Sequence, residues 1–82
     1  MSDPAVTEMA NKLAEDCITV QAEIGNDRLF MELGQVLGSS SQTLEEAFLT
    51  AVRTRMANAA GQKFLERALK THRSQATKND PA

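Results

Sequence analysis

An unbroken apolar stripe in the first third of the chain constrains the fold more than any other feature of the sequence. Its members follow one another at alternating intervals of four and three residues: Val6, Ala10, Leu13, Cys17, Val20 and Ile24. This spacing puts them all on one face of an α-helix and is close to the heptad pattern of helices that pack side by side. Pro4 suits the first position of a helix that is capped by Ser2 or Asp3. Gly25 is a typical stop, so we expect a helix over residues 4–24.

A second, shorter helix is expected over residues 27–37. Apolar side chains surround it nearly completely: Leu29, Phe30, Met31, Leu33, Val36 and Leu37. Such a helix lies either at the centre of a core or against another chain, because it has almost no polar face to turn towards water. Gly38 ends the pattern, and the serines at 39–41 form a connector whose hydroxyls can cap the next helix.

The third expected helix is long and runs from about Gln42 to Thr71. Its first apolar face comprises Leu44, Ala47, Phe48, Ala51 and Val52, and a second set follows Gly61, namely Phe64, Leu65, Ala68 and Leu69. At about 100° per residue, the second set points roughly a quarter-turn away from the first. The helix therefore kinks near Gly61, or a fourth helix begins there, or one continuous helix serves two neighbours. A long helix with a weak point at Gly61 is the simplest of these.

Composition favours a purely helical chain. The sequence has no Trp and no Tyr, and it is rich in Ala, Leu, Glu, Gln, Met and Lys, which favour helices. No segment shows the alternation that is typical of strands. We therefore predict an all-α fold, a three- or four-helix bundle built on an antiparallel hairpin of the first and third helices, with the second crossing between them. The expected domain is residues 1–73, and the polar residues 74–82 are expected to be disordered.

No group of residues in the sequence predicts catalysis, a metal site or a bound cofactor. Glu45 and Glu46 are neighbours on a helix, so their carboxylates diverge by about 100° and do not converge on one substrate. Cys17 belongs to the apolar stripe, where it acts as a small hydrophobic residue. His72 has no catalytic or metal-binding partner nearby in the sequence, and the isolated glycines form no phosphate-binding loop. We therefore expect a protein that is not an enzyme and binds no cofactor, metal or small molecule.

The sequence lacks the patterns of secretion and membrane insertion. A single cysteine excludes an internal disulfide and suits a reducing compartment. The segment after Met1 is acidic and contains Pro4, unlike the basic and then apolar start of a signal peptide. No apolar run approaches the roughly 20 residues that a membrane-spanning helix needs. We expect a cytoplasmic protein.

The charges are divided unevenly along the chain. Residues 1–50 contain nine acidic and two basic residues, a net charge of −7, whereas residues 51–82 contain seven basic and two acidic residues, a net charge of +5. Such asymmetry can mark a surface that binds an acidic partner. It is also expected when the two halves pack together, or when they pair across a dimer.

The apolar residues exceed what three helices bury easily in one monomer, and a second copy would cover the excess most simply. We therefore expect a small adaptor, chaperone-like or regulatory protein that binds other proteins through apolar helix faces and forms a homodimer. The alternative is a compact three- or four-helix monomer whose core buries the apolar stripe of every helix. The expected contact surface comprises Leu29, Phe30, Leu33, Val36, Leu37, Phe48, Val52, Met56, Phe64 and Leu65.

An alternative function rests on the spacing around the serine connector. Leu33, Gly34, Leu37, Gly38, Ser40 and Leu44 occupy positions that make residues 30–48 resemble a helix-turn-helix, a DNA-binding motif. The residues that would contact nucleic acid in such a regulator are Gln42, Thr43, Arg53 and Arg55. Ser39 departs from the motif, which usually has an apolar residue there. Glu45 and Glu46 would face the phosphates, so the local charge argues against this alternative.

Overall fold

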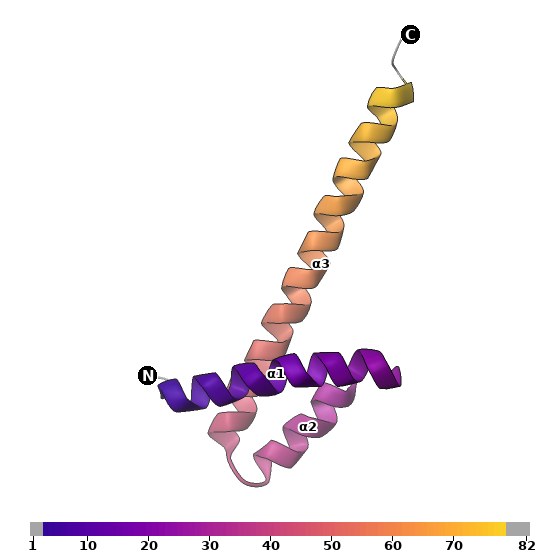
Figure 1. Cartoon of the computed structure of the whole chain (residues 1–82). Coiled ribbons are helices and arrows are strands. Elements are labelled where there is room, and N and C mark those ends of the chain that lie inside the picture. The colour runs from indigo at the N-terminus through magenta and orange to yellow at the C-terminus, as the bar shows by residue number, and fades with distance from the viewer. Residues whose placement is uncertain (1–2, 79–82) are drawn as a thin grey trace.

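The structure, a computed structural model, describes residues 3–78 and consists of three α-helices joined by short turns (Figure 1). They are α1 (Pro4–Ile24), α2 (Leu29–Gly38) and α3 (Gln42–Lys78). No strand occurs among the described residues, so the predicted all-α class is confirmed. The first helix has the predicted bounds, and the second begins two residues later than expected and ends one residue later.

Most of α3 projects from a small packed unit. α1 and α2 pack against the beginning of α3, and the rest of α3 extends away from both as an isolated helix (Figure 1). Every residue from 56 to 75 is exposed. We call α1, α2 and residues 42–55 the head, and residues 56–78 the arm. The 37 residues of α3 span about 55 Å, which accounts for most of the 65 Å length of the molecule.

The core of the head forms where small residues of α1 meet larger residues of α3. Ala10, Ala14 and Cys17 line the inner face of α1, and Phe48 and Val52 of α3 are fully buried against them. Because the α1 residues are small, the two helices can approach closely and enclose the Phe48 ring. Half-buried leucines from all three helices surround this core: Leu13, Leu29, Leu33, Leu37, Leu44 and Leu49.

A glycine allows α2 to lie directly on α3. Gly34 is buried, and a Cβ atom at this position would lie 3.2 Å from Cδ2 of Leu49. That distance is shorter than ordinary van der Waals contact, so a side chain at Gly34 would require the Leu49 side chain to shift by a few tenths of an ångström. The absence of a side chain at this position therefore lets α2 pack closely on Leu49 of α3.

The ends of α1 are formed as the sequence predicts. Oδ1 of Asp3 accepts a hydrogen bond from the backbone N–H of Ala5 at 2.9 Å and caps the helix, with Pro4 at its first position. At the other end, Gly25 has φ 70°, in the left-handed region that glycine adopts without strain. A tight turn follows and leads into α2.

Gln21 joins α1 to α2 through a partly buried hydrogen bond. Its side-chain Oε1 accepts from the backbone N–H of Phe30 at 2.8 Å, and the Cys17 thiol lies 3.9 Å away as a second, weak donor. Phe30 lies in the first turn of α2, where backbone N–H groups have no partner within the helix. Arg28, the N-cap residue of α2, makes no side-chain cap. Gln21 therefore caps α2 from a neighbouring helix.

Two details of α3 differ from the sequence-based expectation. The helix passes through Gly61 without interruption, so no fourth helix begins there, and Figure 1 shows the arm continuing the line of the preceding residues. The predicted kink is thus not confirmed. The helix also reaches Lys78, so residues 74–78 are helical although we assigned them to a disordered tail. The rest of that predicted tail, residues 79–82, lies outside the described residues.

Replacement of Gln21 by leucine is expected to destabilise the head. The variant keeps the side-chain volume but leaves the Phe30 N–H without its acceptor, which costs about 1 kcal/mol of the free energy of unfolding. Chemical denaturation followed by circular dichroism measures the change. Gln35→Leu is the matched control, because Gln35 is an exposed glutamine of α2. Equal stability of the two variants would show that the Gln21 cap contributes nothing.

Candidate functional site

The predicted contact surface divides into three groups in the structure. Phe48 and Val52 are fully buried within the head. Four residues are half-buried and pack against the core: Leu29, Phe30, Leu33 and Leu37. The exposed members are Val36, Met56, Phe64 and Leu65. The first group is covered by the chain itself, because α1 occupies the face of α3 that carries Phe48 and Val52. A partner would therefore meet the exposed members.

The arm carries the most exposed apolar side chains of α3. Phe64 is 65% exposed, Leu65 60% and Leu69 48%. Ala57, Gly61 and Ala68 lie on the same side of the helix as Phe64 at helical spacing. Leu69 was absent from the predicted contact surface, although its position beside Leu65 could have indicated it. No described residue of the head covers this side of the arm.

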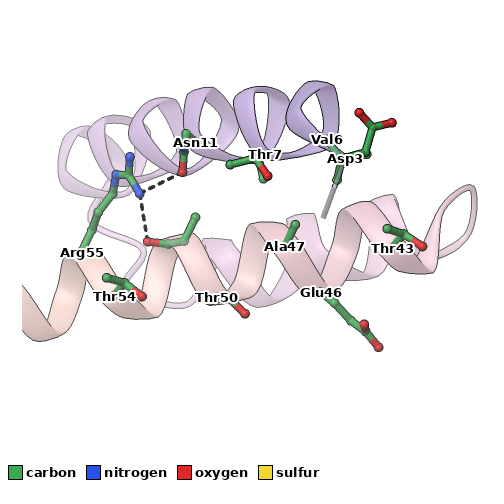
Figure 2. A pocket seen from close by; sticks show the side chains of 12 residues that line it. Asp3, Val6, Thr7, Asn11, Thr43, Glu46, Ala47, Thr50, Thr54 and Arg55 are labelled. Carbon is green, nitrogen blue, oxygen red and sulfur yellow. Dashed lines mark hydrogen bonds between the residues drawn. The ribbon is translucent and has the colours of Figure 1, made fainter. Parts of the chain in front are cut away.

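A groove lies between the first half of α1 and the beginning of α3 (Figure 2). Its volume is about 570 Å³, and its walls are built largely from small side chains. Those walls include Val6, Thr7, Ala10, Ala47, Thr50 and Thr54. Asp3 and Thr43 lie at one end of the groove and Arg55 at the other, and Glu46 points away from α1 (Figure 2). The sequence did not predict this groove, because it depends on how α1 and α3 cross.

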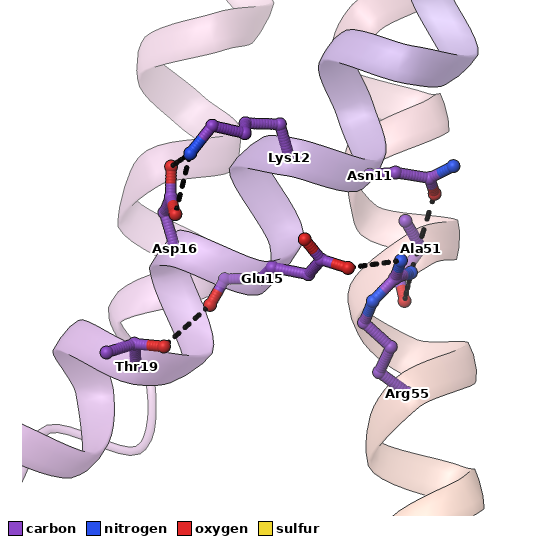
Figure 3. Close-up of polar contacts among 7 residues, drawn as sticks. All are labelled: Asn11, Lys12, Glu15, Asp16, Thr19, Ala51 and Arg55. Atoms are coloured by element: carbon purple, nitrogen blue, oxygen red, sulfur yellow. Dashed lines mark hydrogen bonds and ion pairs between the residues drawn. The ribbon is translucent and has the colours of Figure 1, made fainter.

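Arg55 closes one end of the groove by joining α3 to α1 (Figure 3). Its Nη1 donates to Oδ1 of Asn11 at 3.4 Å and to the backbone carbonyl of Ala51 at 3.2 Å, and Nη2 lies 3.5 Å from Oε1 of Glu15. The Arg55 side chain is 31% exposed, whereas that of Glu15 is 65% exposed. The ion pair therefore adds little stability, but together with the two hydrogen bonds it fixes where the guanidinium lies.

An exposed ion pair lies on a different side of α1 from Asn11 and Glu15 (Figure 3). Lys12 Nζ lies 3.0 Å from Oδ2 of Asp16, one helical turn away, and the hydrogen bond and negative charge of Asp16 raise the pKa of Lys12 (Figure 3). Both side chains are solvated. This pair lies on the surface of α1 and does not line the groove.

The residues predicted for nucleic-acid contact do not form a basic surface. Gln42, Thr43 and Arg53 are exposed, but Arg55 is occupied by its contacts with α1. At the serine connector, the Glu45 carboxylate covers Gly38, because a Cβ atom there would lie 2.8 Å from the Glu45 carboxyl carbon. The start of α3 thus presents carboxylates beside Gln42 and Thr43, which is unfavourable for a phosphate backbone.

Residues 3–78 contain no cluster of metal-ligating side chains. No three His, Cys, Asp or Glu side chains come together there in a way that could hold a metal ion. Cys17 is buried in the core, and burial raises the pKa of its thiol. A protonated, enclosed thiol is a poor nucleophile, so Cys17 has a packing role.

The membrane and family comparisons add two findings. Within the described part of the chain, no helix combines the length and apolar character needed to cross a bilayer. Comparisons with protein-family models, with curated proteins and with solved structures find no match to this chain.

Burial of Cys17 predicts a loss of stability at alkaline pH. The raised pKa means that folding favours the protonated thiol, so this contribution is complete below the pKa of an unfolded thiol, about 8.5, and is lost as pH rises through the folded pKa. We expect the free energy of unfolding to fall as pH increases above about 8.5. Urea denaturation between about pH 7 and pH 10 measures the fall.

The matched control for this pH series is Cys17→Ala, which lacks the thiol at the same core position. Its free energy of unfolding is expected to fall less over the same pH range than that of the unmodified chain. Parallel pH profiles for the two proteins would rule out a contribution from Cys17.

Proposed function

We propose that the protein is a small helical protein–protein interaction module that acts through the apolar side of the arm, with a second copy of itself as the simplest partner. The observation that carries the proposal is the exposure of Phe64 and Leu65 on a helix that nothing in the head covers. Large apolar side chains grouped on one side of an unpacked helix are typical of surfaces that bind other helices.

The energetics of an isolated helix support this proposal. A helical segment with no tertiary packing is only marginally stable in water, because helices gain most of their stability from packing of an apolar face. Full burial of a side chain such as Phe64 or Leu65 contributes about 1.5–3 kcal/mol. Association through this side would therefore both bury the exposed residues and stabilise the helical arm.

Loss of the apolar side chains of the arm is expected to abolish self-association. Sedimentation equilibrium should give the unmodified chain a mass that rises with concentration from 8.9 kDa towards twice that value. The variant Phe64→Ser with Leu65→Ser should stay at the monomer mass, because it removes the apolar contact without touching the head.

Met31→Ser is the matched control for the arm variant. Met31 is 53% exposed, nearly as much as Leu65, but it lies on α2. This variant should associate like the unmodified chain. An unmodified chain that stays at 8.9 kDa at every concentration would exclude the homodimer. Undiminished association of the Phe64 and Leu65 variant would show that another surface is responsible.

A further inference from the structure

We infer that the arm of one copy lies in the groove of a second copy, so that two α3 helices pair in antiparallel orientation about a point near residues 55 and 56. Phe64 then packs on Ala47 of the second copy, and the same contact is repeated by the two-fold symmetry. This inference rests on the proposed self-association and specifies its geometry. The groove and the arm are thus two halves of one interface.

The groove and the arm share one continuous face of α3. The α3 side of the groove contributes Thr43, Ala47, Thr50 and Thr54, and the arm continues the series with Ala57, Gly61, Phe64 and Ala68. Their intervals alternate strictly between four and three residues. This is the heptad spacing by which one helix keeps a single face towards a partner helix. The series runs over more than three heptads, which is long enough for a stable helix pair.

The sizes of these side chains favour an antiparallel pair. In the head half of the face the side chains are Thr and Ala, whereas the arm half contains the large Phe64 ring. An antiparallel pair brings the large residue of each copy against small residues of the other: Phe64 against Ala47, Gly61 against Thr50 and Ala57 against Thr54. A parallel pair would place the two Phe64 rings against each other and set the small residues of the two grooves opposite one another.

The charges along α3 favour the same orientation. The beginning of the helix carries Glu45 and Glu46 and no basic residue, whereas residues 63–73 carry four basic residues and one acidic residue. Antiparallel pairing places each acidic end beside a basic end, whereas parallel pairing places like charges together. In the antiparallel alignment, Arg67 of one copy and Glu46 of the other lie along the same edge of the interface between the two helices. Neither residue has an ion-pair partner within residues 3–78.

A single copy cannot make these contacts with itself. The groove and Phe64 lie on the same side of one uninterrupted helix, about 21 Å apart between Thr50 and Phe64. The arm therefore cannot fold back onto its own groove while α3 remains intact. The groove also has a second wall from α1, including Val6 and Thr7, so the arm of a second copy would contact two helices of the head.

Cysteine trapping tests this geometry. In a Cys17→Ala background, the variant Thr43→Cys with Ala68→Cys should form a covalent dimer on mild oxidation, because position 43 of one copy faces position 68 of the other. Within one copy the two positions are about 37 Å apart along the helix, so an internal disulfide is excluded. Each single variant should remain uncrosslinked. Thr43→Cys with Lys70→Cys, which moves the second thiol to another side of α3, is the matched control.

The outcomes separate this inference from the proposed function. Self-crosslinking of Ala68→Cys alone would show a parallel pair and overturn the inference. Absence of crosslinking in the Thr43 and Ala68 double variant, in a protein that sediments as a dimer, would overturn the inference and leave the proposed function standing. A chain that sediments only as a monomer would overturn both.

Charge reversal provides an independent readout that does not require cysteine. Arg67→Glu and Glu46→Arg should each raise the dissociation constant of the dimer about tenfold, because each reversal creates two like-charged contacts. The combined variant should restore the affinity, since the two charges are exchanged. Lys70→Glu makes the same change of net charge as Arg67→Glu, but at a position that faces away from the second copy. It should leave the dissociation constant nearly unchanged. Failure of the combined variant to recover affinity would overturn the pairing of Arg67 with Glu46.

Discussion

The close approach of α1 to α3 is the contact on which the rest of the structure depends. Ala10 and Ala14 leave room for Phe48, and this packing buries the first apolar face of α3. It also sets the position of α1 relative to the next face of α3, which creates the groove between them. α2 completes the head from another side through Gly34. Nothing in the head then covers residues 56–75 of α3.

Most helix bounds could be predicted because capping and stop residues mark them in the sequence. The alternating stripe of α1, its Asp3 cap and the Gly25 stop are local signals, and the structure contains all three. The first residue of α3 was also predicted, whereas its last residue was not. A polar stretch such as residues 74–78 shows no apolar periodicity, so the pattern could not indicate that the helix continues through it.

The candidate site was predicted only in part, for a physical reason. Exposure of Phe64 and Leu65 could be inferred, because their face is rotated away from the face of Phe48. Burial of Phe48 and Val52 within the head could not be separated from burial by a partner, since both situations require the same apolar pattern. The groove depends on the crossing of α1 and α3, and the Gln21 cap depends on the turn at Gly25. Neither the crossing of two helices nor the course of a turn can be read from the spacing of apolar residues within one helix.

Continuity of α3 at Gly61 decides whether the apolar residues of the arm are buried within the chain or remain exposed. A break there would release the arm from the line of α3 and allow Phe64 to return to its own head, as in a compact four-helix monomer. Glycine weakens a helix by about 1 kcal/mol relative to alanine, so position 61 is the weakest point of the arm. Ala57, Ala59 and Ala60 oppose the break because alanine is the strongest helix former. In the structure the helix stays intact, and its apolar side faces outwards. The same local preference that keeps the arm straight therefore leaves its apolar side exposed in the single chain.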